Sequence, residues 1–170
     1  MQAKGYSLWV MPSGEVYTRL AQTILQLSAE HSTPAFEPHV TVLGGVLGDE
    51  EEIASRCLEL SRALRPYEVR LASVDYRDEY FRCLFLRAEE TEDVREANRK
   101  AREVFGRRED PPYLPHLSLM YGNLAVETKQ RIVAEIGERF DLRFWVRSIH
   151  LFSTQGEPRL WRRVKEFALP

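Results

Sequence analysis

The stretch Phe36-Glu37-Pro38-His39-Val40-Thr41-Val42 returns later in the chain as Tyr113-Leu114-Pro115-His116-Leu117-Ser118-Leu119. Each copy reads aromatic, any residue, proline, histidine, apolar, hydroxyl and apolar, and the two histidines lie 77 positions apart. The polar members are retained, while the apolar ones vary within their type. Agreement of this kind at six of the seven positions predicts an internal duplication and makes the two histidines the first candidates for chemistry.

The segments around the motif repeat in the same order. Apolar residues spaced three and four apart predict helices, and alternating or short continuous apolar stretches predict strands. The first half is expected to contain a strand at 6–11, a helix at 14–30, the motif, a helix at 49–64 and a strand at 67–76. The second half repeats this order at 81–86, 92–105, the motif, 126–139 and 142–152, with a last strand at 159–167. Asp49 and Thr91 are placed to cap the helices that follow them.

This order of elements predicts an α+β fold with two pseudo-symmetric lobes. Each lobe is expected to be an antiparallel-type sheet covered by helices, with the active-site cleft between the lobes. The polar residues Arg77, Asp78 and Glu79 mark the midpoint of the duplication. A chain of 170 residues has the length of about one domain and contains no linker-like stretch, so residues 1–170 are expected to form a single domain.

The composition narrows the function classes. The chain has 24 Lys and Arg against 26 Asp and Glu, a formal net charge of −2, which disfavours nonspecific binding of long nucleic acid. Its two cysteines, Cys57 and Cys83, make neither a disulfide framework nor a paired zinc motif. No apolar run is long enough for a membrane-spanning helix or a signal peptide. We therefore expect a cytoplasmic protein without a membrane segment and, in the absence of an obvious self-pairing surface, a monomer.

Strand geometry gives the repeated motif a chemical meaning. Residues two apart in a strand share a face, so His39 and Thr41 point together, as do His116 and Ser118. Lobes that face each other would bring two imidazoles and two hydroxyls to one cleft. Imidazoles can act as general base and general acid, and hydroxyls can donate to oxygens that gain negative charge. No third metal ligand recurs beside the histidines, so the pattern favours metal-free hydrolysis of a cyclic phosphodiester.

The paired motifs resemble those of the two-histidine phosphoesterase superfamily. Within it, Tyr6-Ser7-Leu8-Trp9, Phe36-Glu37-Pro38-His39 and the stretch from Tyr113 to Gly122 resemble the cyclic phosphodiesterase branch. The resemblance covers essentially the whole chain in length and element order. It implies hydrolysis of ADP-ribose 1″,2″-cyclic phosphate to the 1″-phosphate and of nucleoside 2′,3′-cyclic phosphates to 2′-phosphates. Small nucleotides are the implied partners, and neither a metal nor an organic cofactor is implied.

The resemblance also implies roles for individual residues. His39 and His116 match the catalytic pair, and Thr41 and Ser118 match the hydroxyls that hold the phosphate. Tyr121 matches a tyrosine that contacts substrate, although strand parity places it on the face opposite Ser118 unless a bend at the following glycine turns it back. In the mechanism we expect, His116 takes the proton of the attacking water and His39 protonates the leaving ribose oxygen. Two nearly identical motifs do not by themselves decide between these roles.

Other residues have a structural and a functional interpretation. His31 follows a helix and is expected to cap it, and His150 is expected to be structural. Trp9, Trp145 and Trp161 could stack on a base, but packing is expected for at least two of them. The arginine clusters are expected to be solvated, with a few able to meet the remaining phosphates of a nucleotide. These clusters are Arg107 and Arg108; Arg139, Arg143 and Arg147; and Arg159, Arg162 and Arg163.

Two rival functions stay open on the sequence alone. The first is an RNA-end 2′,3′-cyclic phosphodiesterase or RNA 2′,5′-ligase of the same superfamily, which the negative net charge mildly disfavours. The second is a nucleotide-binding module without catalytic activity, although retention of both histidines and both hydroxyls gives no sign of silencing. The three functions differ in what the protein turns over: small cyclic phosphates, RNA ends or nothing.

Overall fold

The computed structural model describes residues 3–170 and has four α-helices and eight strands in that part of the chain. The helices are α1 (Gly14–His31), α2 (Glu50–Ala63), α3 (Glu92–Val104) and α4 (Val126–Ile136). The strands are β1 (Tyr6–Val10), β2 (Val40–Val46), β3 (Tyr67–Tyr76), β4 (Leu84–Ala88), β5 (His116–Met120), β6 (Arg139–Val146), β7 (Ser148–Ser153) and β8 (Arg162–Ala168). Short 3₁₀ turns at Tyr80–Arg82 and Pro158–Leu160 precede β4 and β8. The α+β class predicted from the sequence is confirmed.

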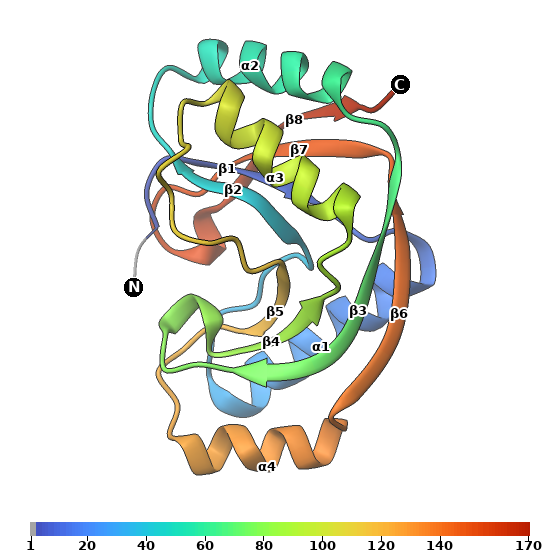
Figure 1. Ribbon diagram of the computed structural model, residues 1–170. Coiled ribbons are helices and arrows are strands. Elements are labelled where there is room, and N and C mark those ends of the chain that lie inside the picture. The colour runs from blue at the N-terminus through green and yellow to red at the C-terminus, as the bar shows by residue number, and fades with distance from the viewer. Residues whose placement is uncertain (1–2) are drawn as a thin grey trace.

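All eight strands belong to one antiparallel sheet with the order β6-β3-β4-β5-β2-β1-β7-β8. The two motif strands, β2 and β5, are neighbours at its centre and share one registered pair, Val40 with Leu117. This narrow junction divides the sheet into two groups of four strands, the two predicted lobes (Figure 1). We call β2, β1, β7 and β8 the His39 lobe, and β5, β4, β3 and β6 the His116 lobe.

Each lobe takes strands from both halves of the sequence. β3 belongs to the first half but pairs with β4 of the second, and β7 comes after the second motif but pairs with β1. A short connection favours a hairpin with the next strand, which is why β3 turns directly into β4. The predicted midpoint at residues 77–79 is consequently part of a hairpin connection inside the His116 lobe, and the exchange ties the two halves together.

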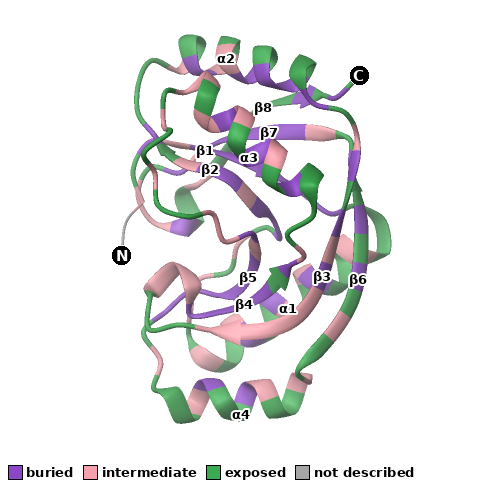
Figure 2. Ribbon diagram, viewed as in Figure 1, coloured by how far each residue is buried: buried purple, intermediate pink, exposed green. Residues whose placement is uncertain are grey.

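The helices cover the outer faces of the lobes. α2 contacts β7 and β8 of the His39 lobe, and α1 contacts β5 and β6 of the His116 lobe. α3 contacts β2 of the His39 lobe and also β3 of the His116 lobe. Figure 1 shows α4 below that same lobe. The buried residues follow the strands and the inward sides of the helices, as Figure 2 shows. The opposite faces of the two lobes are left without helices.

Local capping agrees with the sequence. The Asp49 carboxylate accepts hydrogen bonds from the backbone amides of Glu51 and Glu52 at 2.9 and 3.1 Å, and α2 begins there. The Thr91 hydroxyl accepts from the Val94 amide at 3.3 Å at the start of α3. Both caps satisfy amides that a helix N-terminus leaves without a partner.

Several element boundaries differ from those predicted. The single strand expected at 142–152 is two strands, β6 and β7, because the first pairs with β3 in the His116 lobe and the second with β1 in the His39 lobe. α4 ends at Ile136 rather than 139, since Gly137 has a φ of 91°, a conformation that stops a helix. The strands predicted at 81–86 and 159–167 begin later, at Leu84 and Arg162, because a 3₁₀ turn comes before each.

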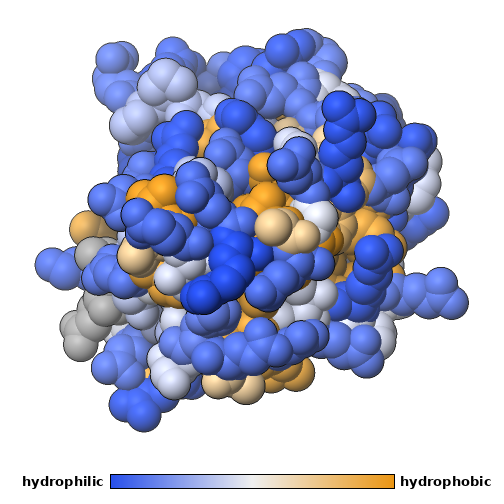
Figure 3. All heavy atoms as spheres, turned by 90° about the horizontal axis from the view of Figure 1, so that it is seen from below, coloured by the Kyte–Doolittle hydropathy of each residue, from blue (hydrophilic) through white to orange (hydrophobic). Residues whose placement is uncertain are grey.

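No helix within residues 3–170 is long and apolar enough to cross a membrane. Figure 3 shows the molecule from below the view of Figure 1. This face is mostly hydrophilic, with apolar side chains scattered among charged ones. The histidines and hydroxyls of the two motifs lie on the inner surface, where the two lobes face each other.

Candidate active site

The two histidines lie where the motif strands begin. His39 immediately precedes β2, and His116 is the first residue of β5. Each Nδ1 lies 2.7 Å from the backbone carbonyl oxygen two residues earlier, that of Glu37 for His39 and that of Leu114 for His116. A carbonyl oxygen only accepts, so each Nδ1 carries a hydrogen and each neutral ring has its lone pair on Nε2. The two motifs therefore share the tautomer as well as the residue.

An aromatic ring of the neighbouring strand supports each imidazole, in two different geometries. Trp9 pairs with Thr41 across β1 and β2, and its indole stacks on His39 with ring centroids 3.5 Å apart and planes 9° apart. Phe85 pairs with Ser118 across β4 and β5, and it meets His116 edge-on at 5.1 Å. Equivalent strand positions thus carry an aromatic ring that contacts the imidazole, with planes 9° apart in one lobe and 64° apart in the other.

The aromatic residue that opens each motif copy contacts the other copy or a residue just after it. Phe36 stacks on Tyr121 with ring centroids 3.8 Å apart, and the Tyr113 hydroxyl donates to the Thr41 backbone carbonyl at 3.0 Å. These two contacts cross the junction between the lobes in opposite directions. They explain why the motif includes an aromatic residue three positions before the histidine.

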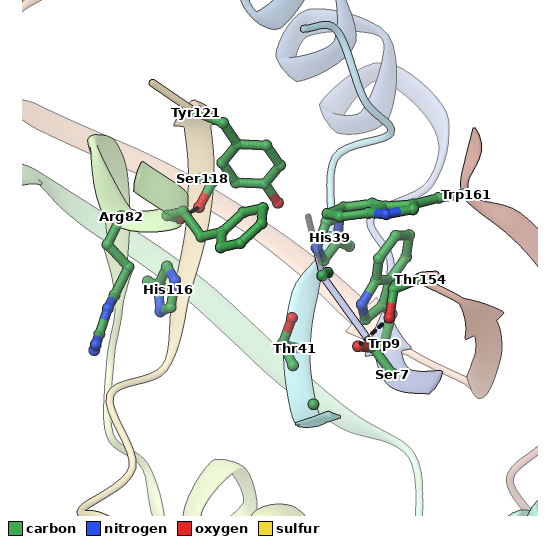
Figure 4. Close-up of a pocket in the computed structure, with 13 residues that line it drawn as sticks. Ser7, Trp9, His39, Thr41, Arg82, His116, Ser118, Tyr121, Thr154 and Trp161 are labelled. Atoms are coloured by element: carbon green, nitrogen blue, oxygen red, sulfur yellow. Dashed lines mark hydrogen bonds between the residues drawn. The ribbon is translucent and has the colours of Figure 1, made fainter. Parts of the chain in front are cut away.

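The two hydroxyls differ in their partners. Ser118 Oγ donates to the backbone carbonyl of Phe81 at 2.9 Å. The Thr41 hydroxyl makes no hydrogen bond to any of residues 3–170, and it lies between the two lobes in Figure 4. Of the two hydroxyls predicted to hold a phosphate, the one on β2 is already available, and the one on β5 is engaged with the chain.

Tyr121 lines the cavity, which simple strand parity does not predict. The pairing of β5 with β4 joins Ser118 to Phe85 and Met120 to Leu84, so one residue between them is skipped. Such a bulge reverses the parity of the residues that follow. β2 has the same bulge, since its pairing with β1 skips Val42. Five positions after each histidine the chain therefore faces the cavity, with a tyrosine in one lobe and Gly44 in the other.

The resulting cavity has a volume of about 240 Å³ and lies between the two lobes (Figure 4). It contains both histidines, both motif hydroxyls and Tyr121, so all five predicted site residues line one space. The remaining lining residues are Ala3, Ser7, Trp9, Gly44, Phe81, Arg82, Thr154 and Trp161. Arg82 is the one formally charged side chain in this set.

Burial holds both imidazoles in the neutral form. It lowers the pKa of His39 to about 3, against a smaller opposing effect of the Glu37 carbonyl. Burial also lowers the pKa of His116, and the guanidinium groups of Arg82 and Arg77 lower it further. The free site therefore begins with two neutral rings at neutral pH, and an anionic ligand between them would raise both pKa values.

Several lining residues could not be identified from the motif alone. Phe81 and Arg82 come from the 3₁₀ turn before β4. Ser7 lies on β1, two residues before Trp9, and Thr154 directly follows β7. The Ser7 and Thr154 hydroxyls lie 3.2 Å apart. The one available signal was the Tyr6-Ser7-Leu8-Trp9 stretch, in which residues two apart share a face.

The tryptophans and remaining histidines are divided between several places. Trp9 is buried at the cavity wall, Trp161 lines the cavity, and Trp145 lies outside it with 53% of its surface exposed. His150 is buried in β7 outside the cavity, and His31 is the last residue of α1. Within residues 3–170, no three His, Cys, Asp or Glu side chains come close enough together to hold a metal ion.

Comparison with known proteins gives a family and two relatives. A family model described as cyclic phosphodiesterase-like protein matches residues 3–169. A cyclic phosphodiesterase of Arabidopsis thaliana is 31% identical over 125 residues, which cover 74% of this chain and 69% of that protein. A 2′,3′-cyclic-nucleotide 3′-phosphodiesterase of Yarrowia lipolytica is 26% identical over 146 residues, covering 79% and 65%. The chain thus spans about two thirds of the length of these relatives.

A solved structure shares the two-lobed fold. E. coli LigT complexed with 3′-AMP aligns over 99% of both chains with a TM-score of 0.66 and 14% sequence identity. At this identity the likeness concerns the fold alone. It extends over all the elements that build the cavity.

Proposed function

The chain belongs to the family of cyclic phosphodiesterase-like proteins within the two-histidine phosphoesterases, and from this premise we propose that it hydrolyses the cyclic phosphates of small nucleotides. The proposed substrates are ADP-ribose 1″,2″-cyclic phosphate, opened to the 1″-phosphate, and nucleoside 2′,3′-cyclic phosphates, opened to 2′-phosphates. The name of the Yarrowia lipolytica relative supports the second class. Cleavage of the bond to the 3′ oxygen leaves the phosphate on the 2′ oxygen.

One observation carries this proposal. Both imidazoles have Nδ1 fixed by a carbonyl at 2.7 Å, so Nε2 is the nitrogen of each ring that is available for proton transfer. Both rings line one cavity, each together with the hydroxyl of its own motif. A proton acceptor and a proton donor on either side of one phosphorus atom are what in-line hydrolysis requires. Hydroxyls between them suit the non-bridging oxygens.

The proposed reaction is a single displacement at phosphorus. Water attacks the phosphorus atom as His116 Nε2 takes its proton, and a new P–O bond forms. The bond from phosphorus to the ribose oxygen breaks, and that oxygen receives the proton of His39 Nε2. The products are a ribose hydroxyl and a phosphate monoester, and the two rings have exchanged protonation states, so one net proton must move back before the next turnover.

Two features favour these roles, against the burial that lowers the pKa of the proposed acid, His39, to about 3. Arg77 and Arg82 oppose a positive charge on His116, which favours the neutral form from which a base starts. His39 lies on the face of the Trp9 indole, which attracts a cation, and faces no guanidinium of its own. Burial disfavours the protonated form of His39, and the negative charge of a bound phosphate offsets this effect. We therefore propose that substrate binding itself protonates His39.

The hydroxyls complete the proposed site. Thr41 is available to donate to a non-bridging oxygen, and Ser118 can do so when its hydroxyl rotates away from the Phe81 carbonyl. The Tyr121 hydroxyl points into the cavity in Figure 4 and can donate to the phosphate or the ribose. The aromatic side chains of Phe81 and Trp161 offer apolar surface for the rest of the nucleotide.

We also propose that small nucleotides, rather than long RNA, are the substrates, and that the protein acts as a cytoplasmic monomer. Support for the first point is the cavity itself, which has one cationic lining residue, Arg82. That guanidinium contacts the Glu79 carboxylate through Nε at 2.8 Å, so little positive charge is left for a polyanion. Both cysteines are buried and unpaired, as in proteins of reducing compartments.

The test is turnover in excess EDTA for wild type, His39→Ala and His116→Ala. His31→Ala, at the end of α1 and outside the cavity, is the matched control. Substrates are ADP-ribose 1″,2″-cyclic phosphate, the nucleoside 2′,3′-cyclic phosphates and a short RNA with a 2′,3′-cyclic end. We expect metal-free opening of the small esters, a loss of about 10²–10⁴-fold or more in each cavity variant and no change in the control.

The other outcomes identify the rival functions. Activity confined to the RNA end would assign the protein to RNA processing. Binding of nucleotide without turnover of any substrate would make it a nucleotide-binding module. Full activity in either cavity variant would refute the paired-histidine mechanism.

A further inference from the structure

A second hollow of about 400 Å³ is formed by residues of β7 and β8 and of the segment after β1, together with Trp145 of β6 and Tyr17 of α1. It is lined by Met11, Pro12, Ser13, Tyr17, Trp145, Arg147, Ser148, His150, Arg163 and Glu166, and we call it the Arg163 groove. Neither the motif nor the proposed mechanism uses these residues. The groove is larger than the cavity itself, which has about 240 Å³.

The groove continues the face of the sheet that carries the active site. Directly opposite residues on neighbouring strands share a face. Thr41 on β2 lies opposite Trp9 on β1, and Trp9 lies opposite His150 on β7. On the same face Phe152 of β7 lies opposite Arg163 of β8. Strands lie about 4.8 Å apart, so β8 lies about 14 Å from the catalytic strand β2.

A continuous stack of planar groups joins the two places. The His39 ring stacks on Trp9 at 3.5 Å, and Trp9 stacks on Phe152 at 3.9 Å. The Arg163 guanidinium then lies 5.6 Å from the centre of the Phe152 ring. Trp9 and Phe152 are buried, each with 2% of its surface exposed, so the stack fixes the position of the guanidinium relative to the His39 ring.

The cations of the groove are weakly partnered. The nearest carboxylate oxygens to the Arg163 guanidinium are those of Glu37 at 3.5 Å and Glu166 at 3.9 Å, whereas the next arginine on β8, Arg162, has one at 2.8 Å. Arg147 forms no ion pair with any of residues 3–170. Glu166 is the one acid that lines the groove, and its carboxylate also accepts from Ser148 Oγ at 2.7 Å.

An exposed indole stands beside these cations. Trp145 has 53% of its surface exposed, and the Arg147 guanidinium lies 5.9 Å from its ring centre. An aromatic ring offers stacking to any base, and paired guanidinium groups recognise phosphate oxygens. Two weakly partnered arginines next to an accessible tryptophan are thus a recognition surface for a nucleotide that carries phosphates.

We propose that the Arg163 groove binds the nucleoside diphosphate portion of a cyclic-phosphate substrate, with Arg147 and Arg163 on the diphosphate and Trp145 on the base. This inference rests on the proposed function, and it selects among its substrates. A nucleoside 2′,3′-cyclic phosphate has a single phosphate, which occupies the catalytic cavity, so it has no further phosphate that the two arginines could bind. A ribose cyclic phosphate linked through a diphosphate to a nucleoside, such as ADP-ribose 1″,2″-cyclic phosphate, fills both places.

The experiment compares two substrates that share adenine. We would measure kcat/KM for ADP-ribose 1″,2″-cyclic phosphate and for adenosine 2′,3′-cyclic phosphate in wild type and in the Arg147→Gln, Arg163→Gln double variant. Arg131→Gln is the matched control, because Arg131 is exposed on α4 and forms no ion pair within residues 3–170. We expect kcat/KM for ADP-ribose 1″,2″-cyclic phosphate, divided by kcat/KM for adenosine 2′,3′-cyclic phosphate, to fall about tenfold or more in the double variant. In the control this ratio should stay within about twofold of wild type.

Binding of ADP provides a second readout that needs no turnover. Calorimetric titration should show ADP binding to the wild type about tenfold or more tighter than to the double variant or to Trp145→Ala, with the control unchanged. Thermal unfolding checks that each variant is folded. An unchanged substrate ratio, or equal ADP affinity in wild type and double variant, would overturn the groove proposal. Absence of turnover in the wild type would instead count against the proposed function, and the ADP titration would still decide on the groove.

Discussion

The two lobes present the same residues in different electrostatic surroundings. His39 lies parallel on an indole and has its pKa lowered chiefly by burial, whereas His116 meets a phenyl edge and also faces Arg77 and Arg82. The backbone geometry, the tautomer and the bulge are equivalent in the two lobes. The two motifs therefore hold two imidazoles in the same way, and the side chains around them differ, as the proposed acid and base require.

After the loss of either histidine, the largest effect should come from the two hydroxyls, whose hydrogen-bond partners differ between the lobes. Thr41→Val removes a donor that has no partner in the free protein, so we expect kcat to fall about 10²–10³-fold with thermal stability unchanged. Ser118→Ala should lower kcat as well, but it also removes the bond to the Phe81 carbonyl. Loss of that bond should cost about 1 kcal/mol, which lowers Tm by about 2–4 °C.

Steady-state kinetics and thermal unfolding of the two variants together test this difference. A Thr41→Val variant with reduced stability would mean that the threonine hydroxyl has a structural partner. A Ser118→Ala variant with unchanged Tm would mean that its bond to the 3₁₀ turn contributes nothing to folding. Either result would remove the distinction between an available and an engaged hydroxyl.

The pH dependence should show that both rings are neutral in the free protein. Activity that needs a protonated ring is lost as pH rises through its pKa, and activity that needs a neutral ring is lost as pH falls through it. Because kcat/KM reports the free enzyme, its limbs should lie near the His39 pKa of about 3 and at the His116 pKa, below the ordinary value of 6.5. We expect kcat/KM to fall about tenfold per unit above about pH 6.5.

The profile of kcat sharpens this prediction. An anionic phosphate between the rings raises their pKa values, so the alkaline limb of kcat should lie at higher pH than that of kcat/KM. Superimposed profiles would contradict the idea that substrate protonates the acid. A kcat/KM that continues to rise above about pH 7 would show that burial does not hold the rings neutral.

The sequence predicts the chemical groups better than the path of the chain. The His39 and His116 motifs, the α+β class and the number of helices follow from apolar spacing and repetition, which are local properties. The exchange of β3 and β7 between lobes is not local: it depends on which edge each strand finds after the chain has turned. The alternating pattern of residues 142–152 fits one strand or two equally well, because each part keeps its own period of two.

Tyr121 shows how a small irregularity changes a site. Parity counted from Ser118 places it on the wrong face, and the bulge in β5 corrects this. Two consecutive apolar residues, Leu119 and Met120, are both buried in the core, as are Val42 and Leu43 of β2. That doubled apolar step, repeated in both motif copies, was a readable signal of the bulge. The lining residues Phe81 and Arg82 carry no comparable signal, since a turn of three residues has no periodicity.

The aromatic supports should differ by about tenfold in their effect on catalysis. Trp9→Leu removes a face that attracts the His39 imidazolium, an interaction of up to about 2 kcal/mol, so we expect kcat to fall about tenfold or more. Phe85→Leu leaves an aliphatic side chain beside His116 in a fully buried position and should mainly lower stability, by about 1–2 kcal/mol. The measurements are kcat and Tm of the two variants. Equal losses of kcat in the two variants, or equal losses of Tm, would contradict this prediction.

The smallest effect should come from the fifth position after each histidine, where the two lobes differ most in size. Tyr121→Phe removes one hydroxyl from the cavity and should lower kcat/KM about 3–10-fold, the range of one neutral hydrogen bond. Gly44→Ala adds a methyl group whose nearest neighbours, the Ser7 hydroxyl and the Thr41 methyl, lie at an ordinary 3.5 Å. Since Gly44 does not have a left-handed backbone, alanine fits there, and we expect kcat/KM within about twofold of wild type.

The pair of variants shows on which side of the phosphate the nucleotide extends. If the nucleotide runs over Trp9 toward the Arg163 groove, it passes the wall that Gly44 shares with Ser7 and Thr154, and that wall must stay open. A larger substitution, Gly44→Val, should then reduce kcat/KM for ADP-ribose 1″,2″-cyclic phosphate more than for adenosine 2′,3′-cyclic phosphate. Equal losses would mean that the absent side chain serves the catalytic phosphate alone, and no loss would mean that the nucleotide leaves on the Tyr121 side.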